Sequence, residues 1–212
     1  MLLVSGWATD HRIFDLLDIK YNYLIPTDFS PFKLADDLPA ALKENKIARV
    51  SMLGFSMGAF VIWDMLPRHE DMIDEVYLVS ARRTYSRDNN ETIKTILGRN
   101  KRGFLRKFYS DCFSENDKGS FEIFKRDLMK VYFEEMDLAH LFEGLDYLSS
   151  HRIEPHRGKN VKIRFVHGAE DRIAPIEEIK ELVGQMPGVE FVPVEGAGHI
   201  PFFSPDFGKA LV

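Results

Sequence analysis

A serine between two glycines constrains this chain more than any other feature. Residues 53–60 read LGFSMGAF, so Gly54 and Gly58 each stand two positions from Ser56. Residues 47–53 read IARVSML, an apolar and β-branched run that is typical of a buried strand. The residues after the serine read MGAFVIWDML, which is long and apolar enough for a helix. A strand, a tight turn and a helix in this order are the context of a nucleophile elbow.

The physics of such an elbow explains both glycines. The strand and the helix pass so closely that side chains at Gly54 and Gly58 would collide with the backbone. The serine adopts an uncommon backbone conformation that projects its hydroxyl away from the sheet. The backbone N–H of Met57 faces the same space and can donate to a developing oxyanion. A pattern this short also arises by chance, so its partners elsewhere in the chain decide its meaning.

Composition narrows the classes of protein to consider. A length of 212 residues suits one domain with an insertion, and an apolar content of 45% allows a substantial core. The net charge of −5 argues against a general nucleic-acid binder. The single cysteine, Cys112, excludes an intrachain disulfide, and we give it a structural role. No apolar run is long enough for a membrane span, and we expect a cytoplasmic protein. We also expect a monomer that uses no metal or cofactor.

Short apolar runs alternate with helical patterns along the chain. The apolar runs predict strands at residues 2–5, 23–26, 47–53, 75–80, 161–166 and 189–194. Helices are predicted between them at residues 33–45, 57–66 and 176–185, and we expect Pro67 to stop the second. This alternation predicts an α/β fold, in which a mostly parallel, six-stranded sheet carries helices on both faces.

Residues 82–150 break this rhythm because they contain no convincing strand. Four stripes of apolar residues at helical spacing cover the segment. A helical insertion of this size in an α/β sheet is typical of a cap. We therefore divide the chain into a core, residues 1–81 and 151–212, and a cap, residues 82–150. Most stripe residues are expected to pack together, while Ile93 and Leu97 are candidates to line a cavity.

Charge is uneven in the predicted cap. Residues 82–130 hold 13 lysines and arginines against 7 aspartates and glutamates, a balance of +6 that leaves −11 for the rest of the chain. Residues 131–150 carry five acidic residues and no lysine or arginine. A basic patch on an acidic protein can recruit an acidic partner, but it can equally be a solvated helical face.

A serine hydroxyl is a weak nucleophile unless a base takes its proton. Among seven histidines, His199 is the strongest candidate for this base. It lies in the sequence EGAGHIP directly after the last predicted strand, in a loop made flexible by Gly196 and Gly198. Functional sites of parallel sheets assemble in loops at the carboxyl ends of strands. The other histidines, including His167 at the end of a strand, are interpreted as structural.

The histidine in turn needs an acid that fixes its tautomer and stabilises its cation. The segment HGAEDRIAP follows the fifth predicted strand and places Asp171 just beyond the strand end, with Glu170 as its nearest rival. A second oxyanion donor is expected from the loop after the first strand. There Gly6 permits a tight turn, the N–H of Trp7 is the candidate donor, and the indole of Trp7 is a candidate pocket wall.

Four motifs now stand together: SGW at 5–7, GFSMG at 54–58, GAED at 168–171 and GHIPF at 198–202. In combination they resemble the α/β-hydrolase superfamily. Within it the chain is most similar to the biotin-pathway carboxylesterases that demethylate pimeloyl-carrier-protein methyl ester. The likeness spans nearly the whole chain and includes LVSARRTYS after the fourth strand and LFEGLDYL in the cap. The triad motifs are specific to the superfamily, whereas caps diverge among its members.

The chain also departs from the family pattern. Ser5 stands where the family usually has histidine, but that histidine is outside the triad. Phe55 stands where many relatives have tryptophan, a change that would reshape the pocket and makes Phe55 a candidate lining residue. The chain starts at what would be the third strand of the family fold, which is why we expect a minimal sheet of six strands.

The resemblance implies a serine carboxylesterase. Ser56 would attack an ester carbonyl, His199 would act as base, and Asp171 would hold the histidine. The amides of Trp7 and Met57 would stabilise the oxyanion, and water would release the acid from an acyl-enzyme. The family substrate is presented by an acidic acyl carrier protein. The basic part of the cap is then a candidate docking face, with the candidates Arg82, Arg83, Arg99, Arg102 and Arg106.

Two other classes of function stay open. The same scaffold supports broad short-chain carboxylesterases or thioesterases and C–C bond hydrolases or lyases of the menaquinone type, because acyl specificity depends on the cap. Some members of the fold are ligand-binding proteins with degenerate triads. All three triad positions are occupied here, which favours an enzyme.

Overall fold

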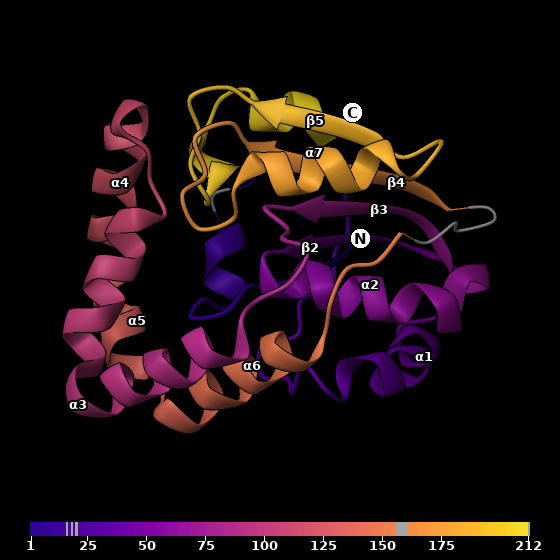
Figure 1. The fold of residues 1–212 in the computed structure, drawn as a ribbon. Coiled ribbons are helices and arrows are strands. Elements are labelled where there is room, and N and C mark those ends of the chain that lie inside the picture. The colour runs from indigo at the N-terminus through magenta and orange to yellow at the C-terminus, as the bar shows by residue number, and fades with distance from the viewer. Residues whose placement is uncertain (16, 18, 20, 156–160, 212) are drawn as a thin grey trace.

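The computed structural model describes residues 1–15, 17, 19, 21–155 and 161–211 (Figure 1). Five parallel strands form one sheet in the order β1-β2-β3-β4-β5. Their bounds are Leu2–Val4, Val50–Phe55, Ile73–Val79, Lys162–Gly168 and Glu190–Val194. Parallel strands require crossover connections, and the helices supply them. The predicted α/β fold with a parallel sheet is confirmed.

The predicted sixth strand is wrong for the described residues. Residues 23–26 contribute only a single bridge, between Leu24 and Leu2. Two hydrogen bonds fix this point, from the amide of Leu3 to the Leu24 carbonyl and from the amide of Leu24 to the Met1 carbonyl. Tyr23 beside it is exposed, so the segment lacks the buried face that would extend the pairing.

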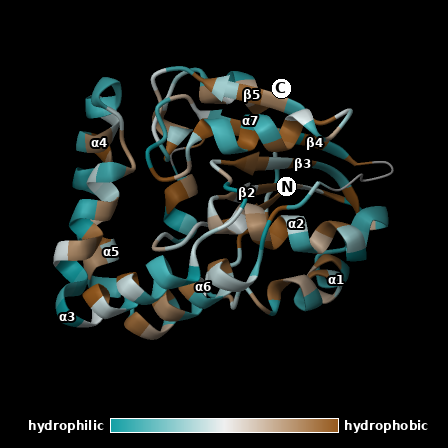
Figure 2. Ribbon diagram, in the orientation of Figure 1, coloured by the Kyte–Doolittle hydropathy of each residue, from teal (hydrophilic) through white to brown (hydrophobic). Residues whose placement is uncertain are grey.

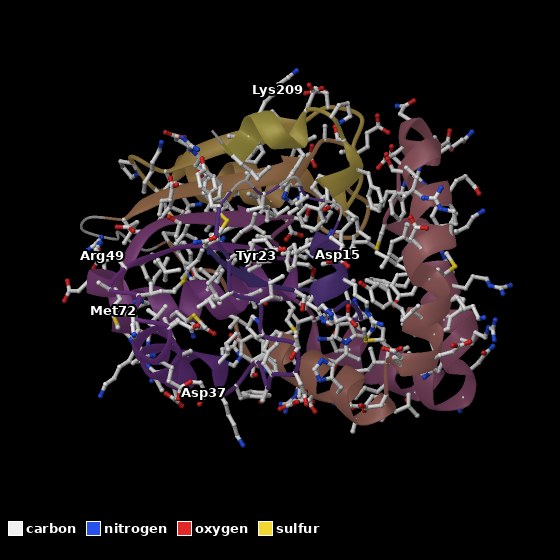
Figure 3. The ribbon with its side chains drawn as sticks, turned by 180° about the vertical axis from the view of Figure 1, so that it is seen from behind. Asp15, Tyr23, Asp37, Arg49, Met72 and Lys209 are labelled. Atoms are coloured by element: carbon white, nitrogen blue, oxygen red, sulfur yellow. The ribbon has the colours of Figure 1, made fainter. Side chains whose placement is uncertain are left out.

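Helices cover both faces of the sheet. Helices α1 (Leu34–Glu44), α2 (Met57–His69) and α7 (Ile176–Gly184) lie on the face seen in Figure 1. The view from behind in Figure 3 shows the opposite face, which is covered by the short turns η1 (His11–Phe14) and η6 (Phe207–Leu211).

Helix α2 continues past Pro67 to His69, so the expected stop at that proline is wrong. A proline removes only one N–H from the helical ladder, and its φ suits a helix. The buried Met65 and Leu66 hold the last turn against the core in spite of that loss.

The core lies between the sheet and these helices. Strands β2 and β3 are buried along most of their length, as expected for central strands of a parallel sheet. Figure 2 shows the same division, with hydrophobic strands inside and hydrophilic outer surfaces on the helices. Among the described residues, no helix has both the length and the apolarity needed to cross a bilayer.

Helices α3 to α6 follow β3 and lie within the segment interpreted as the cap. They are α3 (Arg87–Asp111), α4 (Lys118–Phe124), α5 (Lys130–Glu135) and α6 (Leu138–Ser150), with a π-helical turn, η4 (Lys125–Met129), between α4 and α5. Helices α3 and α6 run side by side, and α4 and α5 rise beyond the carboxyl ends of the strands (Figure 1). We keep the name cap for residues 82–150.

Candidate active site

Ser56 lies between the end of β2 and the first residue of α2, in a strained backbone conformation. Its φ is 52° and its ψ is −111°, a region that side-chain-bearing residues rarely adopt and that costs about 1–3 kcal/mol. A Cβ at Gly54 would overlap the Gly58 carbonyl, and a Cβ at Gly58 would overlap the Val4 carbonyl of β1. The predicted close approach of the incoming strand and the outgoing helix is confirmed at Gly54, whereas Gly58 makes room for the neighbouring strand β1.

The three predicted triad residues form one hydrogen-bonded chain. His199 Nε2 lies 2.9 Å from the Ser56 hydroxyl, and His199 Nδ1 lies 2.7 Å from Asp171 Oδ2. A carboxylate only accepts, so Nδ1 carries the proton, and Nε2 is left free to accept from the serine. All three side chains are buried, which keeps these interactions out of bulk water.

Asp171 is held by its own loop as well as by His199. Its Oδ1 accepts from the backbone amides of Ile173, at 2.8 Å, and Ala174, at 2.9 Å. Burial raises the pKa of the Asp171 carboxyl, but the adjacent His199 and His167 outweigh burial and hold this pKa well below its usual range. Glu170, the rival acid, instead accepts from the Asn116 side chain at the surface.

His167 is a member of the site that sequence reasoning missed. It is fully buried at the end of β4, and its Nε2 donates to the Ala174 carbonyl at 2.7 Å. The same nitrogen lies 3.3 Å from Asp171 Oδ2. His167 therefore connects the loop that carries Asp171, which we call the acid loop, to the end of β4. The sequence around His167 does not indicate this contact with Asp171 and Ala174. The contact depends on how the turn after β4 folds back toward the strand.

The two glycines before His199 serve backbone conformation and close packing rather than the predicted flexibility. Gly196 has a φ of 70°, which favours glycine. A Cβ at Gly198 would overlap the Cys112 carbonyl, and that carbonyl accepts from the amide of His199 at 2.7 Å. The loop is thus held tightly against residues of the cap.

The two predicted oxyanion donors follow the carboxyl ends of two neighbouring strands, β1 and β2. Trp7 follows β1, and Met57 begins α2. Within the described part of the chain, neither backbone N–H donates a hydrogen bond, so both are free for a ligand. Helix α6 holds Trp7 in place, because the indole N–H donates to the Leu141 carbonyl at 2.8 Å and Gly144 leaves room for the ring.

A family comparison agrees with this geometry. A model of the alpha/beta hydrolase family matches residues 2–207. The chain belongs to the alpha/beta hydrolase family. A search of curated proteins found no match to the sequence. Membership of this family, together with the fold, supports a hydrolytic function.

Solved structures similar to this alpha/beta hydrolase share its fold at low sequence identity. A thermophilic esterase from Thermogutta terrifontis is 18% identical with a TM-score of 0.83, covering 99% of this chain and 86% of that one. An enol-lactonase from Burkholderia xenovorans is 17% identical with a TM-score of 0.80, covering 99% and 87%. A bromoperoxidase from Bacillus anthracis is 18% identical with a TM-score of 0.78, covering 99% and 89%.

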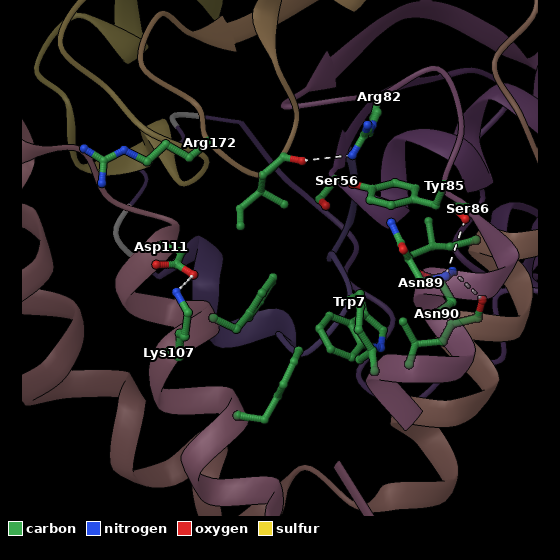
Figure 4. A pocket seen from close by; sticks show the side chains of 16 residues that line it. Trp7, Ser56, Arg82, Tyr85, Ser86, Asn89, Asn90, Lys107, Asp111 and Arg172 are labelled. Atoms are coloured by element: carbon green, nitrogen blue, oxygen red, sulfur yellow. Dashed lines mark hydrogen bonds and ion pairs between the residues drawn. The ribbon is translucent and has the colours of Figure 1, made fainter. Parts of the chain in front are cut away.

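A cavity of about 340 Å³ in this alpha/beta hydrolase is lined by Ser56, by residues of α3 and α6, and by the loops that follow β1, β3 and β4 (Figure 4). Apolar side chains form much of its wall: Trp7, Ile93, Phe104, Phe108, Leu145, Leu148 and Ile173. Polar side chains contribute Arg82, Tyr85, Ser86, Asn89, Asn90, Lys107, Asp111 and Arg172. Ile93 and the Trp7 indole thus line the cavity as predicted.

Phe55 and Leu97 do not line this cavity, which corrects two predictions. The Phe55 ring packs against His199 and Phe202, at centroid distances of 5.4 and 5.0 Å. Leu97 is buried among the helices of the cap. The periodicity of the sequence did not distinguish residues that line the cavity from residues that pack beside it.

Tyr85 is a polar lining residue that sequence reasoning missed. Its ring lies beside Ser56 in Figure 4, and the Arg82 guanidinium lies 5.3 Å from the ring centroid. Burial raises the pKa of the Tyr85 hydroxyl well above its usual value, and the charge of Asp171 adds to this effect. The hydroxyl is therefore neutral and able to donate within the cavity.

The five arginines predicted as a docking face fall into two groups. Arg82 forms two hydrogen bonds to Glu178, and Arg83 pairs with Glu154, so core carboxylates neutralise both. The other three lie exposed on α3 and form no ion pair with any described residue: Arg99, Arg102 and Arg106. The predicted basic face is therefore reduced to one helix.

Proposed function

We propose that this protein is a serine carboxylesterase that works through an acyl-enzyme. The observation that carries the proposal is the continuous chain of hydrogen bonds from Ser56 through His199 to Asp171, at the floor of a cavity. A serine within hydrogen-bond reach of a base, with that base oriented by a buried carboxylate, is the arrangement that activates a hydroxyl for acyl transfer.

Each step of the reaction uses a group already described. Ser56 attacks the ester carbonyl while His199 Nε2 takes the hydroxyl proton, and Asp171 stabilises the imidazolium that forms. The free amides of Trp7 and Met57 receive the oxyanion. His199 then protonates the departing alcohol. Water enters, gives a proton to His199, and attacks the acyl-enzyme. His199 returns that proton to Ser56 Oγ as the acyl–oxygen bond breaks, which releases the carboxylic acid and restores the enzyme.

The cavity supports an acyl ester of moderate length. Its volume of about 340 Å³ is at the lower end of small-molecule sites, and its apolar walls suit a hydrocarbon chain. The names of the similar structures include esterases and an enol-lactonase, and both names describe cleavage of an ester bond. We propose the methyl ester of a pimeloyl group on an acyl carrier protein as the substrate, as in the biotin-pathway carboxylesterases that the sequence resembles.

Helix α3 supports the carrier protein as a partner. It carries the exposed residues Arg99, Arg102 and Arg106, which form no ion pair with any described residue, and the Arg102 guanidinium lies 5.2 Å from the centroid of the Phe133 ring. The same helix contributes Phe104 and Phe108 to the cavity wall. An acidic carrier that docks on this basic face would therefore lie close to the cavity that receives its acyl group.

Substrate comparison tests the proposal. The kcat/KM of the wild-type protein is measured for a carrier-bound pimeloyl methyl ester and for a small soluble ester. A triple variant, Arg99→Glu, Arg102→Glu and Arg106→Glu, should lose at least about tenfold on the carrier-bound ester and keep its activity on the soluble one. The matched control reverses three exposed lysines that do not line the cavity, Lys43→Glu, Lys46→Glu and Lys180→Glu, and should leave both activities unchanged.

The outcomes separate the candidate functions. Equal loss on both substrates would remove α3 as a docking face. Equal wild-type activity on both substrates, unaffected by the triple variant, would indicate a broad short-chain esterase. Absence of hydrolysis of any ester would contradict the esterase assignment itself.

A further inference from the structure

The cap contacts the loop of the catalytic base directly, at a short segment between α3 and α4. We call residues 112–117 the clamp segment. The carbonyl of Cys112 accepts from the amide of His199 at 2.7 Å and lies 3.4 Å from the amide of Ile200. The carbonyl at the end of α3 thus accepts a hydrogen bond from the backbone amide of the candidate base itself.

Two further residues of the clamp segment lie against the same loop. The Ser114 hydroxyl donates to the Gly196 carbonyl at 2.7 Å. Asp117 is buried near the amide of Gly198 and the hydroxyl of Ser120, and its Oδ2 has no hydrogen-bond partner among the described residues. Burial raises the pKa of Asp117, and these two donors oppose that effect. Hydrogen bonds from Ser114 and to Cys112 thus join the clamp segment to both ends of residues 196–199.

The loop is enclosed from the opposite side by the core. A Cβ at Gly168, at the end of β4, would overlap the Gly198 carbonyl, so strand and loop are in direct contact. The amide of Glu170 donates to the Ala197 carbonyl at 2.9 Å. The loop of the base therefore lies between the core and the clamp segment, and neither surface alone accounts for its position.

The clamp segment is itself firmly anchored. Phe113 packs against Phe121, Phe124 and Phe203, with ring centroids 5.2 to 5.7 Å apart. This aromatic contact connects α4 to the residues that follow His199. A displacement of the cap would consequently be transmitted to the backbone of the base.

We infer that the clamp segment, through the Ser114 hydroxyl and the Cys112 carbonyl, positions His199, so the cap completes the active site as well as covering it. The inference rests on the proposed role of His199 as the base. The imidazole must lie within hydrogen-bond reach of both Ser56 and Asp171, and an error of about 1 Å in such a geometry costs about a hundredfold in rate. A loop with two glycines needs outside contacts to reach that accuracy.

Ser114→Ala provides the sharpest test, with Ser114→Thr as the conservative variant that keeps the hydroxyl. The matched control is Ser150→Ala, which removes another serine-to-carbonyl hydrogen bond in the cap far from this loop. Asp117→Ala is a second, independent variant of the clamp segment. For each variant we would measure kcat and KM on a small soluble ester and amide hydrogen exchange at His199 by NMR.

Ser114→Ala and Asp117→Ala should lower kcat by about tenfold to a hundredfold with little change in KM, and should speed exchange of the His199 amide. Ser114→Thr and Ser150→Ala should resemble wild type in both measurements. Wild-type kcat and wild-type exchange in both clamp variants, or equal losses in Ser150→Ala, would overturn the inference. A wild-type protein that hydrolyses no ester would instead contradict the proposed function, while the exchange rates would still report whether the clamp segment positions residue 199.

Discussion

Asp171 is a buried carboxylate whose two oxygens both have polar neighbours. Two backbone amides bind one oxygen, and His199 and His167 face the other. Such a carboxylate has no freedom to rotate, which fixes the imidazole of His199 in one orientation. At the residue scale, catalysis therefore depends on the acid loop and on His167 behind it, as well as on the three residues of the triad.

The lowered pKa of Asp171 predicts how its contribution to stability depends on pH. A carboxyl whose pKa falls on folding stabilises the folded state above its unfolded pKa of about 3.9, and this contribution is lost as the pH falls through the folded value. Between about pH 6 and pH 3, the free energy of unfolding should fall more for wild type than for Asp171→Asn. Urea unfolding at both pH values measures this, and equal falls in the two proteins would contradict the argument.

The elbow is the element that fixes the position of the nucleophile. The helix α2 approaches β1 so closely that Gly58 has no room for a side chain, whereas Gly98 in α3 has open space around its Cβ position. Gly58→Ala should therefore lower the free energy of unfolding by about 3 kcal/mol or more. Gly98→Ala, the matched control, should raise it by about 0.5–1 kcal/mol because glycine disfavours a helix interior. Similar small effects at both positions, by thermal or urea unfolding, would show that the close approach is not real.

The sequence correctly predicted those elements whose structure depends mainly on residues close together in the chain. The elbow, the chain order of the triad residues and the helical nature of residues 87–150 all follow from apolar periodicity and from glycine at positions of close approach. The failures share a different cause. Residues 23–26 look like a strand but lack a second strand to pair with beyond Leu24, and Pro67 fails to end α2 because buried neighbours outweigh one lost hydrogen bond.

Long-range contacts account for the remaining differences. Arg82 and Arg83 read as free basic residues until the fold brings Glu178 and Glu154 to them. The contacts of His167 with the acid loop and of Cys112 with His199 join segments that carry no shared motif. Contacts of this kind are found only in a three-dimensional structure, because the spacing of residues in the sequence does not indicate which loops contact each other.

The whole molecule divides its charge between an acidic core and a basic first half of the cap. Residues 82–130 have a balance of +6 in a chain of net charge −5. Because exposed charges are screened by salt, docking of an acidic carrier on α3 should weaken as ionic strength rises. The kcat/KM for the carrier-bound ester should fall several-fold between about 0.05 and 0.5 M salt, while that for a small neutral ester stays constant. A flat profile for both substrates would contradict electrostatic docking.

Covalent labelling with a fluorophosphonate tests the central claim most directly, because it asks whether Ser56 is a nucleophile activated by His199. The wild-type protein should gain one adduct by intact mass, and the peptide that carries it should contain Ser56. Ser56→Ala should gain none, and His199→Ala should react slower by at least about a thousandfold. Labelling that persists in Ser56→Ala, or an unreactive wild-type protein with the fold intact, would contradict the account.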